Sequence, residues 1–123
     1  MKYFIFTVFF ALCSCYAPER NCSDFKTGAF KYEEYINGNL ETTLFIRSDS
    51  LQIEKYKGKT DTSEVRWINK CEFILTPVNP ESILDQYQIH MKILETTSNA
   101  YKFQYNIVGE DQKETGLAIK VEK

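Results

Sequence analysis

The chain is poor in the residues that carry metal and redox chemistry. It contains one histidine, His90, and its four cysteines include no Cys-x-x-Cys pair. A structural zinc site draws its four ligands mainly from these two residue types, and a thioredoxin-like redox pair needs that short spacing. We therefore expect no metal and no cofactor.

Blocks of like charge and long apolar runs are also missing. Lysines and glutamates are interleaved, and the formal net charge is −2. A sequence-independent grip on nucleic acid needs clustered cations, so no nucleic-acid partner is expected. The longest apolar run is 3–12. It is too short to cross a hydrocarbon core, which takes about 20 residues. Without repeats or low-complexity segments, the 123 residues fit one domain.

What the sequence does contain is an export signal. Lys2 precedes the apolar run, which ends in Leu12-Cys13-Ser14-Cys15. This pattern resembles the lipobox of bacterial lipoproteins, in which the signal peptidase cuts before a cysteine that carries diacylglycerol. Residues 1–14 are then the signal peptide, and Cys15 is the lipid attachment site. Cys13 fits less well, because Leu12 would occupy a position where a small residue is expected. The alternative is an ordinary secretory signal with incidental cysteines.

A lipidated Cys15 would determine where the protein resides. Two or more acyl chains, palmitate among them, anchor a protein stably, whereas one binds weakly. We expect a membrane-anchored protein of the cell envelope, with residues 15–21 as a short tether. Tyr16 follows the cysteine in place of an aspartate that would favour inner-membrane retention. In a cell with two membranes this favours the outer one.

The two remaining cysteines, Cys22 and Cys71, form an even number in an exported chain, which favours a disulfide. The bond would close a loop of about 50 residues and join the start of the domain to its middle. The alternative is two unpaired cysteines, with Cys71 buried in a strand.

From residue 22 onward, hydrophobicity follows a period of two, which is typical of β-strands. Asn37-Gly38 is a strong signal for a hairpin with a type I′ turn. A short helix is expected from Asn79, as its N-cap, through Pro80 to about Tyr87. The expected strands cover 25–34, 40–46, 51–54, 65–67, 71–75, 89–93, 101–107 and 117–121.

This pattern predicts a mainly β protein with a single domain over 22–123. About eight strands with short connections favour an antiparallel meander that closes into an up-and-down, lipocalin-like barrel with one short helix. An open curved sheet and a two-layer sandwich are the alternatives.

Aromatic side chains are the candidates for a binding site. Trp67, Tyr101, Phe103 and Tyr105 could line a ligand pocket, or they could pack the interior as core residues. An eight-stranded barrel can be filled by side chains or can hold one small ligand, and the sequence leaves both possibilities open. Other residues expected in the interior are Phe30, Tyr32, Leu44, Ile53, Phe73 and Leu117.

Catalytic residues are not evident. On the alternation of its strand, His90 points away from the apolar face, and as a general base it would need a carboxylate such as Asp61 or Glu95 close by. We predict that the protein is not an enzyme.

The segments 65–73 and 89–94, together with Asn21-Cys22 and the lipobox, resemble small lipocalin-like bacterial lipoproteins of uncharacterised function. The resemblance implies a β-barrel-like fold and a lipid anchor, and it transfers no catalytic residue. Some chains similar to this one carry the label type IV DNA topoisomerase. That activity needs an ATPase or metal-binding domain and a much longer chain, so the residues do not support it.

Together these observations predict a non-enzymatic envelope protein that binds a small apolar ligand, an envelope component or a protein partner. The alternative is an inhibitor or accessory subunit of an envelope enzyme complex.

Overall fold

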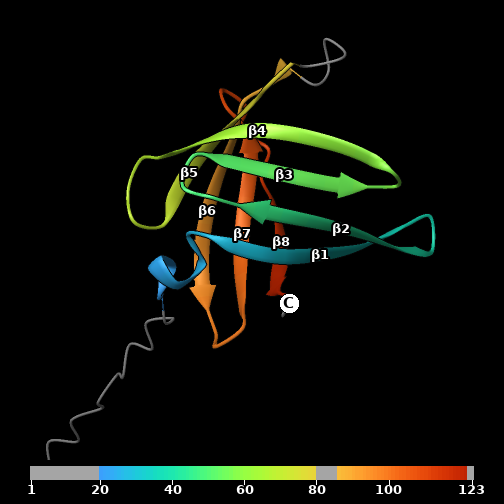
Figure 1. Cartoon of the computed structure of the whole chain (residues 1–123), viewed down its shortest axis with the longest axis horizontal. Coiled ribbons are helices and arrows are strands. Elements are labelled where there is room, and N and C mark those ends of the chain that lie inside the picture. Colours follow the sequence, from blue (N-terminus) through green and yellow to red (C-terminus); the bar gives the residue numbers. More distant parts are fainter. Residues whose placement is uncertain (1–19, 80–85, 122–123) are drawn as a thin grey trace, which may run out of the picture.

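The protein is a closed antiparallel barrel of eight strands that follow one another in sequence order (Figure 1). A computed structural model describes residues 20–79 and 86–121. The first strand pairs with the last from Phe30 to Tyr32, which closes the barrel. The predicted eight-stranded meander barrel is therefore confirmed, in preference to an open sheet or a sandwich. The elements are η1 (Cys22–Phe25), β1 (Gly28–Ile36), β2 (Asn39–Arg47), β3 (Leu51–Tyr56), β4 (Lys59–Trp67), β5 (Glu72–Pro77), β6 (Ile89–Thr96), β7 (Ala100–Ile107) and β8 (Glu114–Lys120).

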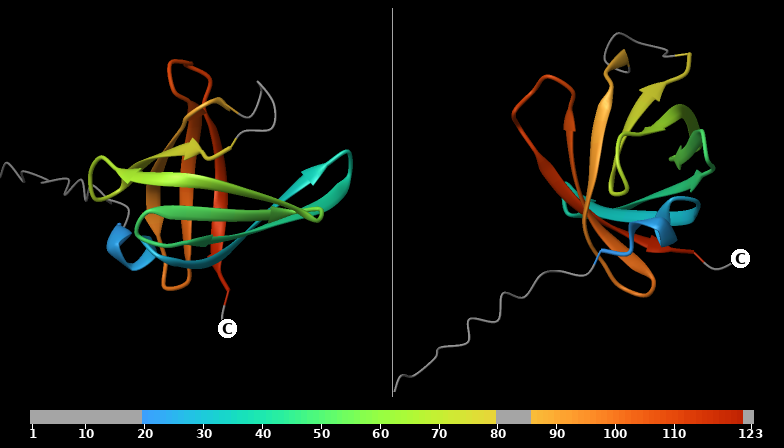
Figure 2. Two further views of the ribbon diagram at one scale, coloured as in Figure 1. Left: turned by 45° about the horizontal axis from the view of Figure 1, so that its top comes forward. Right: turned by 90° about the vertical axis from the view of Figure 1, so that its left-hand side faces the viewer.

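The first four strands cross the last four at a steep angle (Figures 1 and 2). Successive connections alternate between the two ends of the barrel. We call the end with η1 and the β2–β3, β4–β5 and β6–β7 turns the closed end. The end with the β1–β2, β3–β4, β5–β6 and β7–β8 connections is the open end. Within the described residues, no helix has the length and hydropathy needed to cross a bilayer.

The predicted hairpin at Asn37-Gly38 is confirmed. Both residues have positive φ, 52° and 82°, as a type I′ turn requires, and Ile36 pairs with Asn39 across it. Lys57-Gly58 forms a second such turn, with φ of 47° and 77°. These two turns set the registers of β1–β2 and β3–β4.

The structure differs from the expectation for helical segments. The predicted helix from Asn79 to Tyr87 lies mostly outside the described residues. Asn79 itself has φ 53°, in the left-handed region and not in the extended conformation of an N-cap. Phe25 was expected in the first strand but belongs to the 3₁₀ turn η1. There its ring is buried against Phe30 and Tyr101, so η1 contributes to the core.

The predicted inward orientation is confirmed for the aromatic residues Phe30 and Phe73, and it is wrong for three aliphatic residues of β2, β3 and β8. Phe30 and Phe73 are fully buried, as predicted. Leu44 and Leu117, expected inside, face outward and are 47% and 50% exposed. Ile53 also lies on the outer face, opposite Ile46 of β2.

Small and polar residues take the inward positions in place of these aliphatic ones. A Cβ atom on Gly116 of β8 would lie 2.6 Å from Tyr32 Cε2 and 2.7 Å from Phe103 Cζ, so the two rings already fill this space. Ala118, the next inward residue of β8, is fully buried. On β2 and β3 the inward residues include the buried Arg47 and Gln52.

Candidate functional site

The closed end of the barrel is built around a buried arginine. Arg47, at the end of β2, is 2% exposed. Its guanidinium donates to the carbonyl oxygens of Phe25 and Lys26, to Gln52 Oε1 at 3.0 Å and to Tyr101 Oη at 3.2 Å. Each of its three nitrogen atoms is engaged. A buried cation is tolerable when its donors are satisfied in this way.

Aromatic rings surround the same guanidinium. The Cζ atom of Arg47 lies 4.7 Å from the ring centre of Phe73 and 5.0 Å from that of Phe30. These are cation–π distances, and they help to compensate for the loss of hydration. Phe45, Trp67 and Tyr101 complete the cage at 5.6–5.9 Å.

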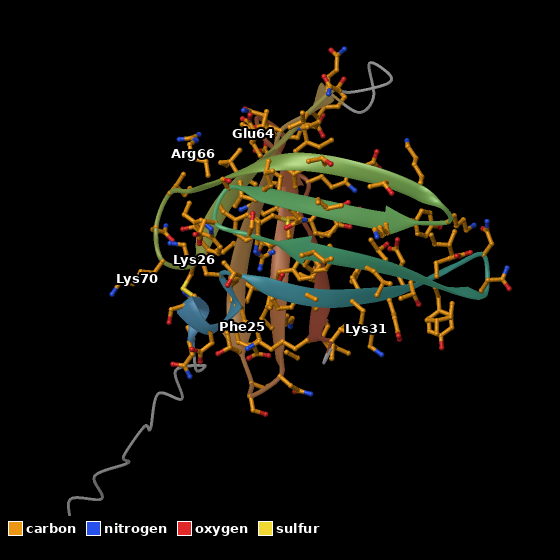
Figure 3. The ribbon with its side chains drawn as sticks, in the orientation of Figure 1. Phe25, Lys26, Lys31, Glu64, Arg66 and Lys70 are labelled. Atoms are coloured by element: carbon orange, nitrogen blue, oxygen red, sulfur yellow. A yellow bond between two sulfur atoms is a disulfide. The ribbon has the colours of Figure 1, made fainter. Side chains whose placement is uncertain are left out.

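A disulfide and hydrogen bonds hold the η1 turn against this end of the barrel. The predicted disulfide between Cys22 and Cys71 is confirmed, with Cα atoms 5.3 Å apart, and it joins η1 to the β4–β5 turn (Figure 3). The backbone of Asn21 donates to Thr96 Oγ1 at 2.8 Å, and Arg20 donates to the carbonyl oxygen of Leu94 at 2.8 Å. The barrel is sealed here.

A cavity of about 250 Å³ lies inside the barrel, above the Arg47 layer. It opens toward the open end. Its walls are mainly apolar, and Arg47 and Gln52 form part of its floor. The lining residues on the walls are Tyr32, Thr43, Phe45, Glu54, Leu75, Ile89, Met91, Phe103 and Tyr105.

One carboxylate, Glu54 of β3, lines this cavity. Gln52 Nε2 donates to Glu54 Oε1 at 2.8 Å, so Arg47, Gln52 and Glu54 form a continuous polar chain. Burial raises the pKa of Glu54, and the facing Asp61 adds to the rise, while the Gln52 hydrogen bond opposes it. The protein thus holds a carboxyl group in an environment that disfavours its charge.

Two tyrosines form the rim of the cavity. Tyr32 Oη donates to Glu34 Oε2 at 3.1 Å, and Tyr105 Oη donates to Glu114 Oε2 at 3.0 Å. Burial, and then these hydrogen bonds, raise the pKa of both phenols above the usual value. Both hydroxyl groups therefore remain protonated at neutral pH.

The four aromatic candidates named from sequence separate into two groups. Phe103 and Tyr105 line the cavity. Tyr101 and Trp67 belong to the closed end, where Tyr101 is 1% exposed. Trp67 also borders a second hollow of about 390 Å³, on the outside between η1 and the β4–β5 turn. Among the described residues no acceptor reaches the buried Trp67 Nε1.

Sequence reasoning missed the polar members of the site, which are Arg47, Gln52 and Glu54. Along the chain they alternate with Ile46, Ile53 and Lys55. The apolar residues of β2 and β3 therefore predicted the wrong inner face for these two strands. The alternation is present on both strands, but there the three polar residues face inward and their aliphatic neighbours face outward.

His90 lies on the outer face of β6, as its alternation predicted. Its Nε2 atom is 3.0 Å from Glu72 Oε1, and its Nδ1 atom is 3.3 Å from Asn106 Oδ1. The hydrogen bond from Asn69, and to a smaller extent His90, lower the pKa of Glu72. The partner of the histidine is thus Glu72, and not the Asp61 or Glu95 that a catalytic role seemed to require. In the part of the chain that the structure describes, no three His, Cys, Asp or Glu side chains gather as a metal site would need.

Comparison with known protein families, with curated proteins and with solved structures gives no match. The cavity and the sequence signals are therefore the basis of the proposed function.

Proposed function

We propose that this is a lipid-anchored, non-enzymatic protein of the cell envelope that holds one small, mostly apolar ligand inside its barrel. The observation that carries the proposal is the cavity of about 250 Å³, with apolar walls, in a barrel sealed at one end. Small eight-stranded barrels of this size bind single small ligands. The volume lies just below the usual range for drug-sized sites, about 300–1,000 Å³, which favours a compact ligand.

The position of Cys22 supports a defined orientation on the membrane. Cys22 is bonded at the closed end, and residues 16–21 separate it from Cys15. Seven residue steps span at most about 25 Å. A lipid on Cys15 would therefore keep the closed end near the bilayer, and the open end would face the aqueous space.

Ligand binding is tested by displacement of a hydrophobic fluorescent dye and by native mass spectrometry on the soluble domain. Replacing Met91, which lines the cavity, with tryptophan should fill it and weaken dye binding at least tenfold. Lys102→Trp, on the exposed outer side of β7, is the matched control and should leave binding unchanged. Equal dye binding by wild type and Met91→Trp would contradict a site inside the barrel.

The anchor is tested by fractionation of bacterial cells that express the full chain. Cys15→Ala should move the protein out of the membrane fraction and abolish labelling with radioactive palmitate. Cys13→Ala should do neither, because the thiol that receives the lipid would still be present. Membrane association that survives Cys15→Ala would contradict the lipobox interpretation.

A second candidate function, attachment to an envelope protein as an inhibitor or accessory subunit, is favoured by the outer face of the barrel. Several large apolar side chains are exposed there on β2, β3 and β8, which is uncommon for a surface without a partner. Recovery of a partner that depends on this face would support the second candidate. The residues are Leu40, Leu44 and Ile46 of β2, Leu51 of β3 and Leu117 of β8, each 39–51% exposed.

A further inference from the structure

We propose that the cavity selects a ligand with a positively charged ammonium group on a compact apolar body, such as an aryl-alkylamine. This inference rests on the proposed function, since it names the class of ligand that the same cavity binds. It rests on which hydrogen-bonding groups of the lining remain available to a ligand.

The one charged donor in the described lining of the cavity is already engaged in hydrogen bonds. Arg47 is the only cation among the lining residues, and its guanidinium bonds to two backbone carbonyls, to Gln52 and to Tyr101. Gln52 in turn donates an amide hydrogen to Glu54. An anionic ligand would therefore find no free cation in the described lining of this cavity.

The acceptors, in contrast, remain available. Within the described residues Gln52 is the one hydrogen-bond donor to Glu54, and it bonds to Oε1, which leaves Oε2 to the cavity. The rim hydroxyls of Tyr32 and Tyr105 donate to Glu34 and Glu114, and the two hydroxyls also interact with each other. Their oxygen atoms are further possible acceptors for a ligand. An ammonium group supplies three donors and no acceptor, which complements this arrangement.

The charges around Glu54 point the same way. Asp61 of β4 pairs with Glu54 across the strands and is its nearest titratable neighbour on that side. Arg47 of β2 is separated from it by Gln52. Lys59 and Lys57, at the open end, pair with Asp61 and Glu41 at 3.9 Å and 3.1 Å. A ligand carboxylate would add a third negative charge beside Glu54 and Asp61, whereas an ammonium would neutralise one.

Aromatic walls add to the preference. Phe45 and Phe103 line the cavity, with Tyr32 and Tyr105 at its rim. A desolvated cation is attracted to the faces of such aromatic rings. The apolar remainder of the ligand would contact Leu75, Ile89 and Met91.

Three probes with one hydrocarbon body and different head groups test the proposal: 4-phenylbutylamine, 4-phenylbutanol and 4-phenylbutyrate. Their affinities are measured by calorimetry at pH 8, well above the ordinary pKa of a glutamate. We expect the amine to bind at least tenfold tighter than the alcohol, and the carboxylate to bind weakest. Lowering the pH toward 5 should reduce the preference for the amine, because protonation of Glu54 removes the attracting charge.

Glu54→Gln should abolish the tenfold preference of the amine over the alcohol, and circular dichroism verifies that the variant is folded. Glu64→Gln, on the exposed outer side of β4 (Figure 3), removes an equal charge elsewhere and should keep the preference. Equal binding of amine and alcohol by the wild type, or tightest binding of the carboxylate, would overturn the charge selection while ligand binding itself stands. If none of the three probes binds, the proposed function fails, and the charge selection fails with it.

Discussion

Replacing Arg47 with alanine is expected to lower the free energy of unfolding by about 4 kcal/mol. The change removes a buried guanidinium together with its hydrogen bonds. It leaves the carbonyl oxygens of Phe25 and Lys26 and the side chain of Gln52 without donors, and each such buried group costs about 1–3 kcal/mol. It also leaves a cavity among the surrounding rings. Urea unfolding followed by circular dichroism measures the effect.

Two further variants show which property of Arg47 is responsible for the loss of stability. Arg47→Lys keeps the charge but has one nitrogen atom, which cannot reach all the acceptors that the guanidinium reaches, so an intermediate loss is expected. Arg66→Ala removes an exposed arginine from the outer side of β4 (Figure 3) and should change stability by no more than about 0.5 kcal/mol. An Arg47→Ala protein within 1 kcal/mol of wild type would show that the closed end does not depend on this side chain.

Loss of the Cys22–Cys71 disulfide is expected to cost a similar amount. The bond joins residues that are 49 positions apart, and a loop of that length corresponds to about 4 kcal/mol in the chain-entropy treatment. The double variant Cys22→Ala/Cys71→Ala should therefore unfold at a much lower urea concentration. Wild type treated with dithiothreitol should move toward the same midpoint, and dithiothreitol should not affect the variant. Coincident unfolding curves for wild type and variant would contradict a stabilising role.

These two effects should not be additive. Arg47 bonds to the backbone of η1 and of the residue after it, and the disulfide fixes the start of the same segment. Once either restraint is lost, η1 has less reason to stay in place, so the second loss removes less. A double-mutant cycle should give a coupling of at least about 0.5 kcal/mol, because contacting groups usually couple to that extent.

The sequence was most informative where local chemistry decides the structure. The Asn37-Gly38 turn needs positive φ, so its two residues predict their own hairpin. Tyr101, Phe103 and Tyr105 form an uninterrupted aromatic row, and no other face of β7 could fill the interior. The pairing of Cys22 with Cys71 followed from counting the cysteines outside the predicted signal peptide and lipid attachment site.

The inward face of β2 and β3 could not be obtained in this way. Their aliphatic residues favour one face, but Gln52 bonds to Arg47 in the interior, and Arg47 is satisfied there by partners from η1 and β7. Those partners are 22 and 54 positions away along the chain, so no local pattern contains the information. The same holds for Gly116, whose inward position depends on the rings of Tyr32 and Phe103.

The surroundings of Trp67 have an optical consequence. It is the only tryptophan in the chain, and it lies at the closed end with its ring centre 4.5 Å from that of Phe73, bordering the same outer hollow as Cys71. A disulfide close to an indole quenches its emission, so reduction should brighten the protein even before it unfolds. Because the indole is not among the residues that line the cavity, a ligand there should change this signal little. The intrinsic fluorescence of the protein would then report on the seal of the barrel, separately from the occupancy of its interior.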